Sequence, residues 1–586
     1  MSTVPDAVVE LATSSGFLLV LILVLPFAAV LLALVLGGRN PRRVAFLTLV
    51  TGLGLAIAIA LALARGGQPL IYLLGNWAPP LGVALRADGL SVTMLLTTVG
   101  VILGVAIYAR NNFTTPPGSG EERAPLMFWI LLMAVWGSLN LIFLAGDLFT
   151  LYVALELVTF AGVPLVCLDG RPATLQAALR YLLFALVGSV LYMLGAVLLY
   201  GAYGTLDIAL LAQRVRPEAA AYAAAALMTG GLLAKTALFP LHLWLPPAHA
   251  GAPAAASAVL SALVVKGSWF LVARLWFDVM PGVVTLSAAQ VLGVLGAGAI
   301  VFGSVVALRQ ERLKLLVAYS TMAQIGYLFL MFPLAFDVAG QLAAPGPALT
   351  GGLLQVVSHA TAKAGMFMAA GLIYAALGHD RITGLAGVAR ALPVSTLAFA
   401  VAGLALMGVV PSGAYVAKKL MLDAADASGQ WWWTAVLQGG AVFTAGYVVL
   451  GLFAMLRRAP APLRLAERVS PLAEWVSLAL SLASLLLVFA VPASVPADVP
   501  ASALTPKNFI MLVALALGGV LLVFGLSGQS WRAAEAGGGA RRRIGEMLGA
   551  GIERADGIIR RWPSATAGLL LLVMLFGVLL LPGASG

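Results

Sequence analysis

Long apolar stretches alternate with short polar loops over almost the whole chain. A helix needs about 20 mostly apolar residues to cross the hydrocarbon core of a bilayer. The sixteen stretches that meet this length are 16–37, 44–64, 88–108, 126–145, 148–168, 175–202, 219–245, 253–277, 284–307, 314–335, 349–377, 392–425, 433–456, 470–491, 508–528 and 565–582. The pattern predicts an all-α polytopic membrane protein with about 14–16 transmembrane helices.

Positive charges divide the loops into two sets. Most of the 34 Lys and Arg residues lie in odd-numbered loops, and few lie in even-numbered loops. Cytoplasmic loops of membrane proteins carry an excess of Lys and Arg. We therefore expect a multi-pass protein of a bacterial-type cytoplasmic (inner) membrane, with the odd-numbered loops in the cytoplasm and both termini on the outer side.

Composition narrows the classes of function. Charged residues make up 10% of the chain, against about 25% in soluble domains, so the lipid bilayer is expected to contact most of the surface. The net charge of +11 does not indicate nucleic acid, because the arginines are spread over short loops. One cysteine, Cys167, cannot form an internal disulfide or hold an iron–sulfur cluster. No phosphate loop, metal-ligand cluster or nucleophile–base set is recognisable, so we expect no catalytic residue, no metal and no cofactor bound by this chain.

The ionisable side chains inside the apolar stretches are the candidate functional residues. A charge at the centre of a transmembrane helix costs about 2.5–3.5 kcal/mol on insertion scales, so such residues are functional candidates. The set comprises Glu156, Arg180, Lys235, Lys266, Lys363, Lys418 and Lys419. A purely structural ion pair is the alternative for Glu156, Lys235 and Lys266. A helix-end charge that reaches the interface is the alternative for Arg180.

Two helix breaks are predicted beside these lysines. Pro240 follows Lys235, and residues 408–411 (GVVP) precede Lys418. Proline removes a backbone donor and clashes with the preceding turn, and a broken helix persists at membrane depth only where it lines protein or a wet cavity. Breaks in comparable places predict two inverted five-helix repeats, with ion sites at the broken helices 7 and 12.

The repeats define the expected domain organisation. Residues 1–125 would hold helices 1–3, 126–277 the first repeat (helices 4–8) and 284–456 the second repeat (helices 9–13), followed by C-terminal helices in 457–586. Residues 529–563 are rich in arginine and have a tryptophan near each end, which favours an amphipathic connector on the cytoplasmic face. A short strut that contacts a neighbouring subunit is the alternative.

Histidines extend the basic set. A lysine desolvated in the membrane can load and release a proton, and a carboxylate that moves nearby would switch it between its charged and neutral forms. Histidine titrates near neutral pH and can relay protons. His242 and His249 are seven residues apart, about two turns, and would lie near one face if the helix persisted. A structural role is the alternative for both, whereas His359 and Lys363 at i, i+4 share one helix face.

Five stretches contain most of these residues. They are DLFTLYVALELVTFAGVPL (147–165), AKTALFPLHLWLPPAHAGAP (234–253) with its continuation to Lys266, LKLLVAYSTMAQIGYL (313–328), SHATAKAGMFMAAG (358–371) and GVVPSGAYVAKK (408–419). Over about residues 80–455 the chain resembles the antiporter-like membrane subunits shared by respiratory complex I (NADH:quinone oxidoreductase), energy-converting hydrogenases and Mrp-type cation/proton antiporters.

The resemblance implies roles for the residues of the first repeat. Glu156 would pair with Lys235, and Lys266 would be the connecting lysine of the eighth helix. Arg180 stands where a sixth-helix lysine is common and would tune the pair. The two histidines are candidates because of their positions after the break and not through the resemblance: His242 would continue the pathway, with His249 as a further candidate.

The resemblance also implies roles in the second repeat. His359 and Lys363 would form the relay of the eleventh helix. Lys418 matches the basic residue of the broken twelfth helix, towards the exit, and Lys419 is the competing neighbour.

Three functions remain open at this point. The first is a proton-translocating membrane subunit of a redox-driven complex of the complex I or hydrogenase type, which moves H⁺ along buried Glu, Lys and His residues and has no catalytic chemistry of its own. The second is a subunit of an Mrp-type Na⁺/H⁺ antiporter, and the third is a proton-path partner in an inorganic-carbon uptake system. In each case the expected partners are other membrane subunits of a multisubunit complex and H⁺, alone or with Na⁺.

Overall fold

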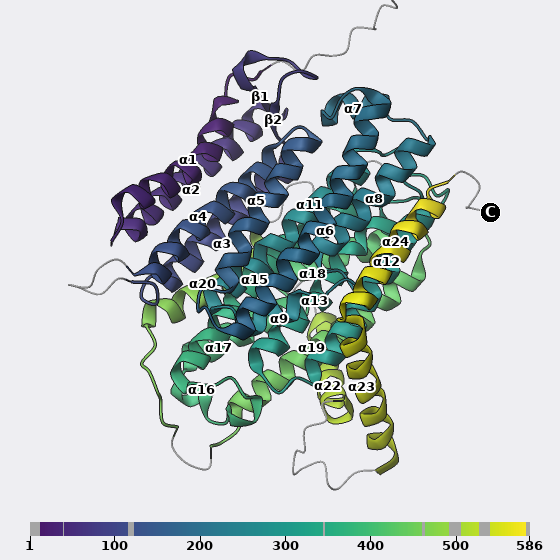
Figure 1. The fold of residues 1–586 in the computed structure, drawn as a ribbon. Coiled ribbons are helices and arrows are strands. Elements are labelled where there is room, and N and C mark those ends of the chain that lie inside the picture. Colours follow the sequence, from purple (N-terminus) through teal and green to yellow (C-terminus); the bar gives the residue numbers. More distant parts are fainter. Residues whose placement is uncertain are drawn as a thin grey trace, which may run out of the picture.

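The computed structural model describes residues 12–38, 40–114, 122–343, 346–459, 463–490, 506–526 and 539–581. Both chain ends, and residues 527–538 at the start of the predicted connector, lie outside the described residues. Long helices run side by side as a bundle, with α7 and the strands at one end and α16 and α23 at the other (Figure 1).

The N-terminal part consists of three long helices and a small hairpin. Its elements are α1 (Phe17–Leu36), α2 (Asn40–Gly66), β1 (Leu70–Leu73), the 3₁₀ turn η1 (Leu74–Asn76), β2 (Ala84–Ala87) and α3 (Gly89–Ala109). The strands pair antiparallel, with Leu70 opposite Ala87. The apolar pattern did not predict this hairpin, because four-residue strands are too short to show a period-2 alternation.

The middle of the chain covers the two stretches that the sequence predicts as repeats. The first stretch contains α4 (Arg123–Leu144), α5 (Leu148–Val166), α6 (Pro172–Tyr203), α7 (Ile208–Arg214), α8 (Ala219–Thr236), α9 (Leu245–Gly251), α10 (Ala254–Val259), the π-helix η2 (Leu260–Val264), α11 (Val265–Arg274) and the π-helix η3 (Leu275–Val279). The second contains α12 (Leu286–Leu308), α13 (Leu313–Phe329), α14 (Met331–Leu334), α15 (Pro347–Leu377), η4 (Ile382–Gly384), α16 (Val388–Ala391), α17 (Pro393–Leu406), α18 (Gly413–Ala427) and α19 (Trp431–Leu456).

The C-terminal part of the chain adds helices that pack against the earlier helices of the bundle. Its elements are α20 (Pro471–Leu485), η5 (Leu486–Ala490), α22 (Pro506–Leu526), α23 (Gly539–Ile559) and α24 (Trp562–Leu579). Helix α24 packs against α8, and α23 packs against α12 and α22. Figure 1 shows α23 (yellow) extending past the end of the bundle beside α22.

Within the described residues, thirteen helices are long and apolar enough to cross a membrane, so the chain is a multi-pass membrane protein. This number is lower than the 14–16 expected from the sequence. Helices α8 and α17 account for part of the difference, because α17 has 14 residues and α8 carries a lysine among alanines. A third expected stretch, 508–528, lies partly outside the described residues. Helices α8 and α17 are also the two that end where breaks were predicted.

Two glycines bring α6 and α8 into close contact. A Cβ placed on Gly188 would lie 2.6 Å from the carbonyl oxygen of Gly231, and a Cβ on Gly231 would clash with the carbonyl oxygen of Gly188. Only residues without a side chain allow the backbones to approach this closely. This contact holds α8 firmly against α6 one turn before Lys235.

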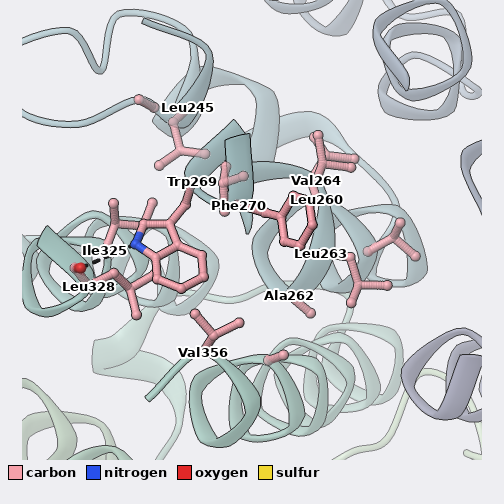
Figure 2. Close-up of a cluster of buried hydrophobic side chains, with 14 of the residues drawn as sticks. Leu245, Leu260, Ala262, Leu263, Val264, Trp269, Phe270, Ile325, Leu328 and Val356 are labelled. Carbon is pink, nitrogen blue, oxygen red and sulfur yellow. Dashed lines mark hydrogen bonds between the residues drawn. The ribbon is translucent and has the colours of Figure 1, made fainter. Parts of the chain in front are cut away.

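The helical segment of residues 254–279 lies in the centre of the bundle, and its most apolar stretch is entirely buried. Trp269 of α11 donates from Nε1 to the carbonyl oxygen of Leu328 in α13, at 3.1 Å, and Val356 of α15 lies beside its ring (Figure 2). Phe270 extends the same apolar cluster towards η2 (Figure 2). This dry layer isolates the polar groups of the same helix from lipid.

An ion cluster fastens α3 to the end of α11. Arg274 donates to both carboxylate oxygens of Asp88, each at 2.6 Å, and to Asp278 at 2.6 Å. Asp88 also caps α3 by accepting from the backbone N–H of Ser91. Burial would raise the pKa of Asp88, but the hydrogen bonds and charge of Arg274 lower it to about 2, so this carboxylate is ionised at neutral pH.

Candidate functional site

The first break places Lys235 at the end of a helix. Helix α8 ends at Thr236, Ala237 adopts a left-handed conformation with φ of 56°, and the next helix begins at Leu245. The carbonyl oxygen of Ala234 accepts from Trp244 Nε1 at 3.1 Å and from the backbone N–H of Ala237 at 3.2 Å, which ties the end of the helix to the non-helical segment. Residues 237–244 are thus non-helical at the place where the sequence predicted a break.

Lys235 is buried against Glu156 of α5. Its Nζ lies 3.7 Å from Oε1 of Glu156, and it donates to Thr159 Oγ1 at 2.9 Å and to the Leu155 carbonyl oxygen at 3.2 Å. Among the described residues neither Glu156 oxygen has a hydrogen-bond partner. The pair expected from the sequence is therefore present, but α5 holds the ammonium group mainly through Thr159 and Leu155.

A cavity of about 20 Å³ adjoins Lys235. Its polar lining comes from Thr159, Tyr181, Lys235 and Ser268. A volume of this size holds about one water molecule. Ser268 belongs to α11 and accepts from Thr236 Oγ1 at 3.1 Å, so the cavity opens the Lys235 site towards the helix that carries Lys266.

Arg180 does not join this pair. It lies half-buried on α6, and no ion pair involves it in the part of the chain that the structure describes. Its expected role in tuning Lys235 therefore has no contact to support it.

Lys363 contacts α13 directly, and Lys266 is linked to the same helix through Ser261. Lys266 is fully buried and donates to the carbonyl oxygen of Ser261, which lies in the widened π-helical segment η2. Ser261 Oγ lies 2.9 Å from Thr321 Oγ1. Lys363 is also fully buried and donates to Ser320 Oγ at 2.5 Å. Ser320 and Thr321 are adjacent, so α13 lies between the two lysine sites.

Helix α15 presents a polar row at four-residue spacing. Gln355, His359 and Lys363 are all buried on this helix. Among the described residues neither ring nitrogen of His359 has a hydrogen-bond partner. The charges of Lys266 and Lys363 both act on His359, which places the histidine within electrostatic reach of both lysines.

A glutamine on α13 links that row to the second break. Gln355 donates to Gln324 Oε1 at 3.2 Å, and Gln324 Nε2 donates to Tyr447 OH at 3.1 Å and to the Leu406 carbonyl oxygen at 3.4 Å. Leu406 is the last residue of α17, and Gly408 follows with φ of 69°. The chain resumes helical geometry at Gly413, again where the sequence predicted a break.

Lys418 and Lys419 of α18 face different surroundings. Lys419 Nζ lies 2.5 Å from Asp423 Oδ1, and both side chains are about 40% exposed (39% and 40%). The Cδ of Lys418 lies 3.8 Å from where a Cβ on Gly408 would be. Lys418 is therefore the lysine that adjoins the break.

The two histidines of the first break do not share a helix face. The expectation that they would is wrong, because the chain is not helical between residues 237 and 244. His249 stacks on Phe367 with ring centroids 4.8 Å apart, and among the described residues its ring nitrogens have no partner. His242 instead lies 2.9 Å from Oδ1 of Asp556 in α23.

Sequence reasoning missed Asp556 and Lys314. Asp556 is 3% exposed although it belongs to the predicted amphipathic connector, and it is 314 residues away from His242. The charge pattern favours a loop position for Lys314, but it is 7% exposed and donates to the Ala252 carbonyl oxygen at 2.6 Å. Sequence alone held no signal for Asp556, whereas the apolar run that follows Lys314 is compatible with a helical position for it.

Residues 145–444 match the family described as NADH:quinone oxidoreductase/Mrp antiporter, TM. The chain belongs to this family. It is 34% identical to the NADH-quinone oxidoreductase subunit N of Desulforudis audaxviator, over 69% of this chain and 79% of that protein. The buried lysines, Glu156 and both helix breaks all lie within the matched region.

Two further likenesses of this family member are to antiporter proteins. It is 27% identical to a Na(+)/H(+) antiporter subunit of Bacillus subtilis, over 61% of this chain and 70% of that protein. Its fold matches a chain of the Mrp complex from Dietzia sp. DQ12-45-1b with a TM-score of 0.72 and 22% identity, covering 88% of this chain and 98% of that chain.

Among the described residues, no group of three or more His, Cys, Asp or Glu side chains could hold a metal ion.

Proposed function

We propose that this chain is a proton-translocating membrane subunit of a redox-driven complex of the complex I or hydrogenase type. The observation that carries the proposal is the buried Lys235–Glu156 pair beside the first helix break, at a contact of 3.7 Å. A lysine and a carboxylate inside a membrane are costly, and such residues mark proton paths in pumps and transporters.

The first step is a change of protonation at Lys235. With Glu156 close, the charged ammonium form is favoured; when the carboxylate moves away, burial favours the neutral amine and the proton leaves. Glu156 has no hydrogen-bond partner among the described residues, so this movement breaks no hydrogen bond. The one-water cavity beside Ser268 gives the proton a route towards Lys266.

The following steps run across the centre of the bundle. Lys363 donates to Ser320 of α13, and Lys266 donates to the carbonyl oxygen of Ser261, whose hydroxyl bonds to the neighbouring Thr321. His359 lies within electrostatic reach of both lysines. A proton on any one of these groups disfavours a proton on the next, since like charges repel in a low dielectric. Transfer would therefore proceed in sequence.

The exit lies at the second break. The row on α15 continues through Gln324 to the Leu406 carbonyl oxygen, where α17 ends. Lys418 adjoins this break and would release the proton, while Lys419 is paired with Asp423 nearer the surface. The odd-numbered, arginine-rich loops would face the cytoplasm.

An Mrp-type antiporter subunit is the second candidate. The 27% identity to the Na(+)/H(+) antiporter protein of Bacillus subtilis favours it. The higher identity of 34% to a NADH-quinone oxidoreductase subunit N supports the redox-driven assignment. Both candidates use the same buried residues and differ in the partners that supply the energy.

Purification of the native complex tests the assignment. The complex would be isolated through a tag on this chain, its subunits identified by mass spectrometry and its iron measured. We expect hydrophilic subunits that carry iron–sulfur clusters. A complex that contains only small membrane subunits and no iron, and that exchanges H⁺ for Na⁺ in vesicles, would replace the redox assignment with the antiporter assignment.

A further inference from the structure

A carboxylate of α23 reaches the non-helical segment of the first break. Asp556 accepts hydrogen bonds from His242 at 2.9 Å, Tyr319 OH at 2.7 Å and Arg560 Nε at 2.7 Å. His242, Tyr319 and Asp556 are 0%, 3% and 3% exposed. Three parts of the chain, the break, α13 and α23, therefore meet at one buried carboxylate.

The surroundings of His242 determine which of its nitrogens carries the proton. Burial would raise the pKa of Asp556, but the hydrogen bond from His242 and the charge of Arg560 hold it below its ordinary value. An ionised carboxylate only accepts hydrogen bonds, so Nε2 of His242 must be the donor. Among the described residues Nδ1 has no partner although it is buried.

This arrangement leaves Nδ1 as the basic nitrogen. A carboxylate on one ring nitrogen fixes the tautomer and stabilises the imidazolium that forms when the other nitrogen takes a proton. Phe239 and Phe302 pack around the imidazole ring of His242, and the centroid of each phenyl ring lies 5.9 Å from that of the imidazole. The two phenyl rings also contact each other, with centroids 4.8 Å apart. The ring is thus held in an apolar surround where a fixed carboxylate acts strongly.

We propose that Asp556 is a positioning residue for proton transfer, and that it makes Nδ1 of His242 a proton-loading atom at the first break. A transported proton forms an N–H bond at Nδ1, the ring becomes an imidazolium facing the Asp556 carboxylate, and release of that proton restores the neutral ring. Asp556 stays ionised throughout. This inference rests on the proposed function and adds to it a group from outside the two repeats.

A second contact of α23 supplies a matched control. Glu553 lies 2.9 Å from Arg309 Nε, at the end of α12, and Arg309 also donates to the Leu526 carbonyl oxygen at 3.2 Å. Glu553→Gln therefore weakens the docking of α23 without touching His242. Asp556→Asn keeps the size of the side chain but removes the charge that fixes Nε2–H.

The test measures proton translocation by the full complex in sealed vesicles. Asp556→Asn is expected to lower the translocation rate by roughly 10- to 100-fold, which corresponds to the loss of one hydrogen bond to a charged group. Asp556→Glu keeps the charge and is expected to have a rate close to that of the wild type. Glu553→Gln is expected to stay near the wild-type rate. In a His242→Gln background, Asp556→Asn should add no further loss, because the carboxylate acts through that ring.

Three results would overturn the inference: a normal rate for Asp556→Asn, an equal loss for Glu553→Gln, or a full additional loss in the His242→Gln background. If Asp556→Asn does not assemble, failure of Asp556→Glu to translocate in an assembled complex also overturns it. Lys235→Ala is measured in parallel. Normal translocation in that variant rejects the proposed function itself, whereas loss there with normal Asp556→Asn rejects only the role of Asp556.

Discussion

Lys235 and Glu156 form a buried ion pair whose closest approach, 3.7 Å, is too long for a hydrogen bond. The ammonium group donates instead to Thr159 Oγ1 at 2.9 Å and to the Leu155 carbonyl oxygen. Charge attraction and hydrogen bonding thus come from different residues of α5. Two hydrogen bonds hold the ammonium group, whereas none among the described residues holds the carboxylate.

Thr159→Val should slow proton translocation by about tenfold, because it removes a hydrogen bond to a charged group without changing the side-chain shape. The amount of assembled complex should not change. Thr236→Val is the matched control: its hydroxyl bonds to Leu232 and Ser268 and not to Lys235. Equal losses in both variants would mean that Thr159 acts only through packing.

Lys418→Ala should stop most proton translocation, whereas Lys419→Ala should leave it nearly unchanged. Lys418 adjoins the second break, while Lys419 is paired with half-exposed Asp423, and an exposed pair of this kind contributes roughly 0–1 kcal/mol. Vesicle assays on both variants, with complex quantified by immunoblot, check the assignment. The reverse pattern would exchange the roles of the two lysines.

Gly408→Ala should destabilise the protein by roughly 1–2 kcal/mol, because a side chain is strained at the positive φ of this residue. Thermal unfolding of the detergent-solubilised complex measures the loss. Gly439 in α19 is the control, since a Cβ there meets no atom within 4 Å and alanine favours a helix interior. A melting temperature that falls as much for Gly439→Ala would show that Gly408 has no special conformational role.

Asp88→Asn should cost about 2 kcal/mol of stability at pH 7, the worth of the shift that lowers the pKa of Asp88 from 3.8 to about 2. The carboxylate's contribution is fully present above the unfolded value near 3.8 and is lost as the pH falls through about 2. The wild type and Asp88→Asn should therefore converge in acid unfolding curves. A difference that stays constant down to pH 2 would show that the charge is not responsible.

The buried lysines could be predicted from the sequence because a charge inside a membrane costs free energy, so each lysine within an apolar stretch stands out by itself. Lys235 and Glu156 were paired correctly, and Lys266 and Lys363 are both fully buried. Proline and glycine also marked both places where helical geometry ends, because they act on the backbone locally. Whether the two halves are inverted repeats stays a prediction.

The contact between the first break and α23 could not be predicted. The partner of His242 is 314 residues away, and nothing in an arginine-rich amphipathic segment distinguishes a carboxylate that will be buried from one that will face water. The expectation of a shared face for His242 and His249 failed because the non-helical chain extends well past Pro240. Likewise the choice between Lys418 and Lys419 depends on which face of α18 packs against the second break.

Proton translocation by the Lys235→Ala complex in sealed vesicles tests the central claim most directly. The amount of assembled variant complex is measured alongside, because the substitution leaves Glu156 without its ion-pair partner inside the protein. The account predicts that its translocation is almost abolished while the Lys419→Ala complex translocates normally. Translocation at the wild-type rate in an assembled Lys235→Ala complex would contradict it.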